Sequence, residues 1–154
     1  MSDVIHSDRG RRLLWHGFFL FLLGLVTGLI VPALTNPRMG VAAHLEGVMN
    51  GIFLVTLGLA WDRFALSRRL TAALFWLALY GAYVNWMSTL LAAILGTSRN
   101  TPIAGAGFSG VPWRENLVDF GLISLAFSMI VACVFVLYGL RTRGVRPMNS
   151  VNVD

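Results

Sequence analysis

The chain has 154 residues, of which 56% are hydrophobic and only 12% are charged. An average soluble domain is roughly 25% charged, so this composition is typical of an integral membrane protein and excludes a soluble catalytic module. The formal net charge is +5 and every basic residue is an arginine, but no basic surface interleaved with aromatic side chains indicates nucleic-acid binding.

Four apolar segments follow one another, approximately at residues 13–34, 41–61, 70–95 and 117–140. Each is near or above the ~20 residues that a helix needs to cross a bilayer. We therefore expect an all-α fold, an integral membrane four-helix transmembrane bundle, with a single membrane domain over residues 1–154. The first segment follows arginines as a signal peptide does, but it is too long and no small-x-small cleavage site closes it, so we expect a retained helix.

The first segment carries His16 near one end and the pair Gly24 and Gly28 further along. We expect a structural role at the membrane interface for His16. Glycines four residues apart let two helices approach closely, which indicates packing against a neighbouring helix. Pro32 ends this helix, because a residue that precedes proline disfavours the helical conformation.

The second segment places polar side chains where the chain enters lipid. At 100° per residue, His44, Gly47 and Gly51 fall on one helix face, with Glu46 and Asn50 on the adjoining flank. Polar groups inside a membrane are costly and usually functional. The glycine face predicts either a groove for a flat ligand beside His44 or plain helix packing, and Glu46 and Asn50 are spaced to hydrogen-bond each other or a ligand.

The two histidines His16 and His44 lie near opposite ends of their helices, separated by most of the roughly 30 Å membrane thickness. They cannot ligate one metal within a protomer. If His44 binds haem, the iron therefore keeps an open position, at which it can act as a Lewis acid on a substrate oxygen. The alternative is a helix-end histidine that hydrogen-bonds a neighbour.

The third segment offers Tyr83 on an aromatic face and Asn85 nearly opposite. Aromatic stripes more often serve packing, whereas an amide in the dry core needs partners. The two faces can serve one site only if a neighbouring protomer contributes.

The longest connector, residues 96–113, lies on the same side of the membrane as His44, where it could cap a site. Glu115 and Asp119 open the last helix, where carboxylates suit the positive end of the helix dipole, and the deeper Asp119 could face the site. Cys133, the single cysteine, is expected to be a buried small hydrophobe.

Arginines are distributed unevenly between the two sides of the predicted bundle. Nine lie before the first helix, in the connector after the second, or after the fourth, while the other side carries three: Arg38, Arg99 and Arg114. By the positive-inside rule, this split predicts that both termini are cytoplasmic.

The stretch from residue 24 to 40, continued by Ala43-His-Leu-Glu-Gly-Val-Met-Asn-Gly51, resembles the hydroxylaminobenzene mutases, small bacterial membrane enzymes. Residues 75–81, Asn85-Trp86 and residues 102–107 extend the likeness. More distantly, the chain resembles styrene oxide isomerase, in which a histidine is likewise followed six residues later by Asn-Gly. It departs from that relative at Tyr80, where the aligned residue is an aspartate.

The resemblance implies a membrane-bound isomerase of the bacterial inner membrane that rearranges an aryl hydroxylamine, hydroxylaminobenzene, to an ortho-aminophenol. The likeness to styrene oxide isomerase also implies haem b, bound between the protomers of a trimer. The expected site residues are His44 as the axial ligand, Gly47 and Gly51 beside the cofactor, Asn50 and Asn85 as orienting partners, Tyr83 as a donor or stacking wall, and Glu46 for acid–base chemistry.

Two alternatives remain at this point. The first is an epoxide isomerase of the styrene oxide type. The second is a small membrane transporter, which would need a membrane-embedded carboxylate. Glu46 is the only such group near a helix interior, and its expected position close to one end weakens this interpretation.

Overall fold

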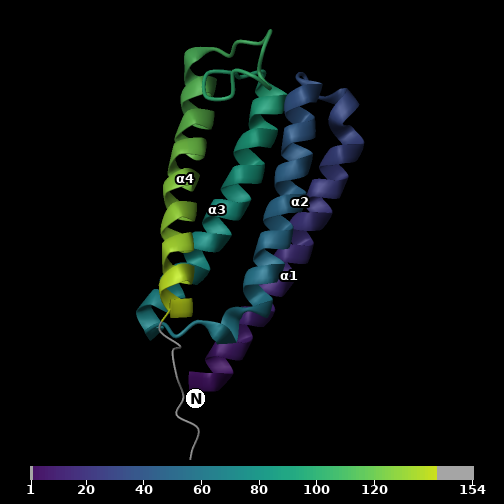
Figure 1. The fold of residues 1–154 in the computed structure, drawn as a ribbon. Helices are drawn as coiled ribbons and strands as arrows, with labels where there is room; N and C mark the ends of the chain where they lie inside the picture. Colours follow the sequence, from purple (N-terminus) through teal and green to yellow (C-terminus); the bar gives the residue numbers. More distant parts are fainter. Residues whose placement is uncertain (1, 142–154) are drawn as a thin grey trace, which may run out of the picture.

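The computed structural model describes the backbone of residues 2–141 and the side chains of residues 8–141. Four long helices follow one another: α1 (Ser2–Ile30), α2 (Pro37–Leu59), α3 (Arg68–Leu95) and α4 (Pro112–Arg141) (Figure 1). Short 3-10 turns at Val31–Ala33 and Trp61–Arg63 follow α1 and α2. All four helices are long and apolar enough to cross a membrane, which confirms the predicted all-α membrane fold.

Hydropathy placed the start of each helix too late in the chain, and the ends of the first two helices a few residues too far along. The clearest case is α2, which begins at Pro37 rather than near residue 41, because the side chain of Asn36 accepts a hydrogen bond from Met39 N and caps the helix. Glu46 therefore lies about 14 Å along the helix from Pro37, near its middle. The expectation that Glu46 sits close to a helix end is wrong.

α1 and α2 pack backbone against backbone. A Cβ at Gly47 would lie 2.5 Å from Gly24 Cα, and a Cβ at Gly51 would lie 2.7 Å from Phe21 N. No side chain fits between the two helices at these positions, so the glycine spacing predicted in both helices is used for close helix packing.

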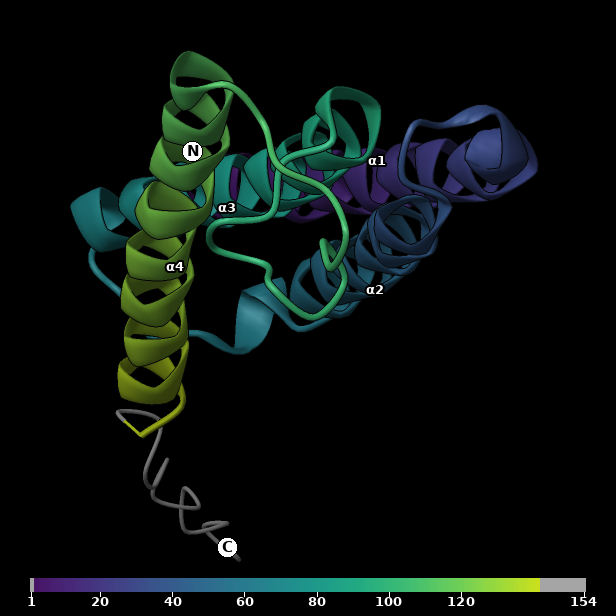
Figure 2. The ribbon, with the colours of Figure 1, turned by 90° about the horizontal axis from the view of Figure 1, so that it is seen from above.

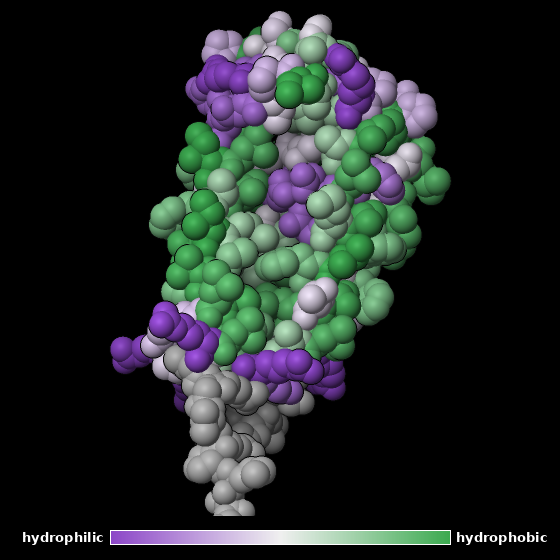
Figure 3. Space-filling model, in the orientation of Figure 1, coloured by the Kyte–Doolittle hydropathy of each residue, from purple (hydrophilic) through white to green (hydrophobic). Residues whose placement is uncertain are grey.

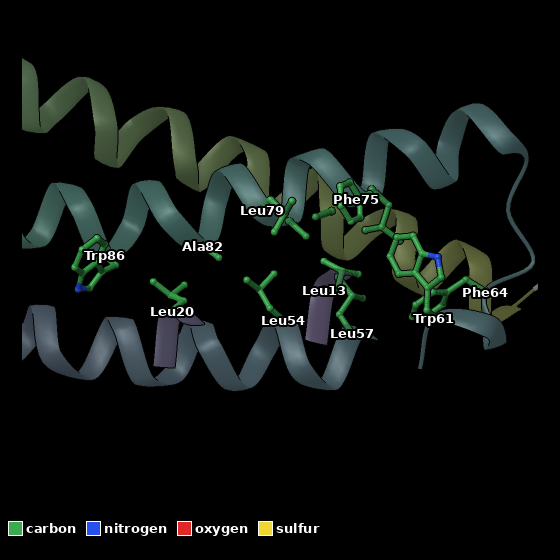
Figure 4. Packing of buried hydrophobic residues seen from close by; sticks show 13 residues of the cluster. Leu13, Leu20, Leu54, Leu57, Trp61, Phe64, Phe75, Leu79, Ala82 and Trp86 are labelled. Atoms are coloured by element: carbon green, nitrogen blue, oxygen red, sulfur yellow. The ribbon is translucent and has the colours of Figure 1, made fainter. Parts of the chain in front are cut away.

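α3 stands between the α1–α2 pair and α4 (Figure 2). α4 packs mainly on α3 and makes little contact with α1 or α2, so the four helices leave one side of α3 open between α2 and α4. The main hydrophobic core joins α1, α2 and α3 through residues such as Leu20, Leu54 and Ala82 (Figure 4).

Large hydrophobic side chains cover the outside of the helices, and hydrophilic residues gather at the two ends (Figure 3). The start of α1, the α2–α3 turn and the end of α4 lie together at one end (Figure 1). The arginines counted for orientation cluster there, apart from Arg143 and Arg146, which lie outside the described residues. The cytoplasmic location of the termini stays a prediction. Cys133 is exposed, so the expectation that it is buried is wrong.

Candidate functional site

A carboxylate and two amides meet between α2 and α3. Asn85 Nδ2 donates to Glu46 Oε2 over 2.6 Å, and Asn50 Nδ2 donates to the same oxygen over 3.0 Å. Asn50 Nδ2 also donates to the backbone oxygen of Glu46 over 2.8 Å, which fixes the amide on the helix. The predicted pairing of Glu46 with Asn50 is confirmed, and Asn85 completes the group, called the polar cluster below.

The polar cluster leaves one oxygen of the carboxylate without a partner. Both amides donate to Oε2, and Oε1 accepts no hydrogen bond from residues 8–141. Asn50 is buried, with 7% of its surface exposed, while Glu46 and Asn85 are partly exposed. Figure 3 shows hydrophilic residues in the hollow between α4 and α2, surrounded by the hydrophobic belt. The cluster can therefore present a proton-accepting oxygen in an apolar setting.

His44 faces α1, not the polar cluster. Its Nδ1 lies 2.8 Å from the carbonyl oxygen of Gly24. Because a carbonyl oxygen can only accept, Nδ1 carries a proton, and in the neutral ring the lone pair is on Nε2. A Cβ at Gly28 would lie 2.8 Å from Nδ1, so this glycine makes room for the ring.

The hydrogen bonding of His44 fits a residue that would hold a metal or haem through its second ring nitrogen. Metal-binding histidines usually donate their second nitrogen to a carbonyl or carboxylate, which fixes the tautomer, and His44 does so through Gly24. The side chain is partly exposed, and no described residue hydrogen-bonds Nε2. Within residues 8–141 no three His, Cys, Asp or Glu side chains gather around one point.

His44 and Glu46 occupy different faces of α2. Residues two apart on a helix are about 200° apart, so one side chain points to α1 and the other to α3. The expectation that Glu46 flanks the histidine face is wrong, because Glu46 lies on nearly the opposite side of the helix from His44. In one protomer His44 and the polar cluster do not share a site.

Gly47 and Gly51 lie on the α1 side of α2, as expected, but α1 fills the space over them. A Cβ at Gly47 would also lie 2.9 Å from Trp86 Cδ1, and Trp86 Nε1 donates to Thr27 Oγ1 over 3.1 Å. The open groove for a flat ligand is therefore not formed within the chain. Of the two roles considered, the structure gives these glycines helix packing.

Tyr83 contacts His16 of α1. Its hydroxyl lies 3.0 Å from His16 Nδ1, and the two rings meet edge to face at 5.8 Å. Tyr83 and Asn85 point in different directions, as their spacing predicted, so Tyr83 lies outside the polar cluster. Tyr80 hydrogen-bonds Ser124 of α4 over 2.8 Å.

The connector after α3 is tied over the end of the bundle. The buried Asn36 donates from Nδ2 to the carbonyl oxygen of Ala104 over 3.0 Å, and its N–H donates to the carbonyl oxygen of Ala93. Arg38 donates to the carbonyl oxygen of Ala106. Sequence reasoning missed the role of Asn36, although an asparagine directly before a helix-starting proline signals a capping residue.

Glu115 and Asp119 hold the same connector on the α4 side. The Glu115 carboxylate accepts from the N–H groups of Ser98, Arg99 and Gly110, at 2.8 to 3.3 Å. Asp119 Oδ2 pairs with the Arg99 guanidinium at 3.0 Å. Both carboxylates therefore anchor the connector, and neither hydrogen-bonds a member of the polar cluster.

Comparison with known proteins agrees with the resemblance. The family model described as styrene oxide isomerase matches residues 9–141. Hydroxylaminobenzene mutase HabB of Ectopseudomonas oleovorans is 49% identical over 137 residues, which cover 88% of this chain and 84% of the relative. Hydroxylaminobenzene mutase HabA of the same organism is 46% identical over 125 residues, covering 80% and 93%. No solved structure gives a significant match.

Proposed function

The chain belongs to the styrene oxide isomerase family and is an isomerase, and we propose that it rearranges hydroxylaminobenzene, or a close aryl hydroxylamine, to an ortho-aminophenol. The relatives at 49% and 46% identity carry the name of this activity. The structural observation that supports it is the polar cluster, in which two amides orient one carboxylate and leave Glu46 Oε1 unpaired within the described chain.

The reaction needs one proton carrier and no net electrons. The N–O bond breaks, a C–O bond forms at the ortho carbon, the ortho hydrogen leaves as a proton, and the nitrogen gains a proton. Substrate and product are isomers, so one group that accepts a proton and gives it back completes the balance. We assign this group to Glu46 Oε1, acting first as base and then as acid.

Asn50 and Asn85 are positioning residues in this scheme. By donating to Oε2, they hold the carboxylate in one orientation and stabilise it in the apolar interior. The surrounding hydrophobic side chains exclude water, which otherwise competes with the ring for the migrating oxygen. Among the described residues Tyr83 hydrogen-bonds His16 and no member of the polar cluster, so we propose that its effect is indirect, through the α1–α3 contact with His16.

We propose haem b as the cofactor, which His44 would hold through Nε2. When bound, it would supply Lewis-acid chemistry towards a substrate oxygen. The contribution of the chain is to fix the histidine: Gly24 sets its tautomer and Gly28 leaves space for its ring.

His44 and the polar cluster point away from each other, which favours an assembly in which they meet across protomers. We propose a homotrimer, as the resemblance implies, in which His44 of one copy and the polar cluster of the next contribute to one site. We further propose that this assembly lies in the bacterial inner membrane with both termini cytoplasmic, as the arginine distribution indicates.

The test is a spectrum and an assay on one detergent-purified preparation. A Soret band should disappear in His44→Ala together with the conversion of hydroxylaminobenzene to 2-aminophenol. His16→Ala is the matched control, since His16 pairs with Tyr83 instead and should leave the band in place. Conversion by a His44→Ala protein without haem would contradict the haem proposal, while absence of conversion by the haem-loaded native protein would contradict the mutase proposal.

Epoxide isomerisation is the second candidate, because the family model bears the description styrene oxide isomerase. Styrene oxide and hydroxylaminobenzene should be assayed side by side on the same preparation. We expect a higher kcat/KM for the hydroxylamine, and the reverse order would favour the epoxide.

A further inference from the structure

A second feature of the α2–α4 side is an apolar cavity below the polar cluster. Its volume is about 390 Å³. No charged side chain lines it, and its one hydroxyl, that of Thr56, already donates to the carbonyl oxygen of Ile52. The lining residues are Phe53, Thr56, Leu57, Ala60 and Phe64 on the α2 side, and Cys133, Val136, Leu137 and Leu140 on α4.

The cavity continues the face of α2 that carries the polar cluster. Phe53 follows Asn50 by three residues and Leu57 by seven, so at 100° per residue they fall on nearly the same face as Glu46. The rise from Asn50 to Leu57 is about 10 Å. In Figure 3 the hydrophilic residues in the hollow have hydrophobic residues below them, towards the α2–α3 turn. One face of α2 is thus polar at its middle and apolar towards its end.

The cavity exists because α4 leans on α3 and not on α2. At the lower end the chain closes it: Phe64 lines the cavity, and Ala65 N donates to the carbonyl oxygen of Gly139 over 3.0 Å, tying the α2–α3 turn to α4. An occupant therefore has a closed lower end and two apolar walls, and Asn50 of the polar cluster lies about one helical turn beyond Phe53 along α2.

We propose that this cavity binds apolar substituents at the para position of the aryl hydroxylamine, so that the substrate class extends to para-alkyl aryl hydroxylamines. The inference rests on the proposed function. The reaction takes place at the nitrogen and the adjacent ring carbon, which must both lie near Glu46. The para carbon is the ring position farthest from the nitrogen, so with the reacting atoms at the cluster a para substituent projects away from it, along α2 towards Cys133. A phenyl ring with a four-carbon chain is comparable in length to the ~10 Å rise from Asn50 to Leu57.

The kinetic test compares two substrates in two variants. Hydroxylaminobenzene and its 4-butyl derivative are assayed with the native protein, with Cys133→Trp, which fills the cavity, and with Val134→Trp, which adds the same bulk at a neighbouring α4 residue that is 55% exposed and does not line the cavity. The quantity measured is the ratio of kcat/KM for the butyl substrate to that for hydroxylaminobenzene. Partition of the butyl group into lipid or detergent affects all three proteins equally and cancels.

Cys133→Trp should lower this ratio about tenfold, because the indole would occupy the volume that the butyl group needs. Val134→Trp should leave the ratio unchanged. An equal ratio in all three proteins would overturn the inference. If the native protein converts neither substrate, the proposed function itself fails, which is a different outcome.

A second readout uses the native protein and no activity. Cys133 is the single cysteine of the chain and lines the cavity, so alkylation by a membrane-permeant maleimide reports on this one position at the cavity wall. We expect 4-butylaniline, an unreactive analogue, to slow alkylation and aniline to slow it far less. An alkylation rate that neither aniline changes would indicate that a lipid acyl chain occupies the cavity. Alkylation that occurs only after the oligomer is dissociated would indicate that a second copy of the chain covers it. Either result would overturn the inference.

Discussion

Replacing Glu46 by glutamine separates the proton-transfer role of this residue from its role in holding α2 against α3. The glutamine keeps one oxygen in place of Oε2, which can still accept from Asn50 and Asn85. Exchanging charge-assisted for neutral hydrogen bonds costs about 1 kcal/mol each, so the variant should fold. Its amide group occupies the position of Oε1 and can only donate. Loss of a general base should lower kcat by about 10² to 10⁴ with little change in KM.

The assay follows the conversion of hydroxylaminobenzene to 2-aminophenol by chromatography, beside the apparent unfolding midpoint in detergent. Glu46→Ala is the matched comparison, because it removes the acceptor of Asn85 and leaves Asn50 only its bond to the backbone oxygen at position 46, at a cost of about 1 to 3 kcal/mol. We expect Glu46→Gln to be stable and inactive, and Glu46→Ala to be unstable and inactive. A glutamine variant with the native kcat would refute proton transfer by Glu46.

Three further substitutions test other parts of the structure. Gly47→Ala should lower the apparent Tm by about 5 °C, because its Cβ would lie 2.5 Å from the α1 backbone. Gly40→Ala is the control and should leave the Tm unchanged, since the nearest atom to its Cβ is the end of a flexible side chain. Equal Tm values for the two variants would contradict the close packing of α1 and α2. Gly28→Ala should displace the ring of His44 and weaken haem binding about tenfold in a titration of the apoprotein, and unchanged affinity would argue against a fixed ring orientation. Asn36→Ala should lower the free energy of unfolding by about 1 to 2 kcal/mol. Asn36→Asp keeps the capping oxygen but loses the donor to the connector, so it should lower this free energy by less. An alanine variant as stable as the native protein would contradict the anchoring role of Asn36.

The fold was accessible to sequence analysis because each helix is a long apolar run, and run length against membrane thickness decides the number of spans. The exact ends of the helices could not be predicted in this way, since they depend on capping groups and not on hydropathy. Asn36 shows the reason: its side chain starts α2 while its amide reaches the connector, and only the first role leaves a local sequence signal.

The candidate site was predicted as far as single-helix geometry allows. Glu46 and Asn50 lie one turn apart, so their hydrogen bond could be expected, and the divergence of Tyr83 from Asn85 follows from spacing alone. Which side chain of α3 reaches Glu46 depends on the register of two helices, which no local pattern encodes. His44 and Glu46 were expected on adjoining faces of one helix, and this prediction was wrong. Their spacing was enough to show it, because residues two apart on a helix differ by about 200°.

The packing of α4 mainly on α3 has an evolutionary consequence. The close-packed glycines, the histidine and the polar cluster all lie on α1, α2 and α3, whereas α4 supplies one wall of the apolar cavity. Side chains of α4 that face this cavity can change without disturbing the α1–α2 interface. Related chains can therefore change the substrates that they accept through substitutions in α4 alone, while the reacting groups on α2 and α3 stay the same.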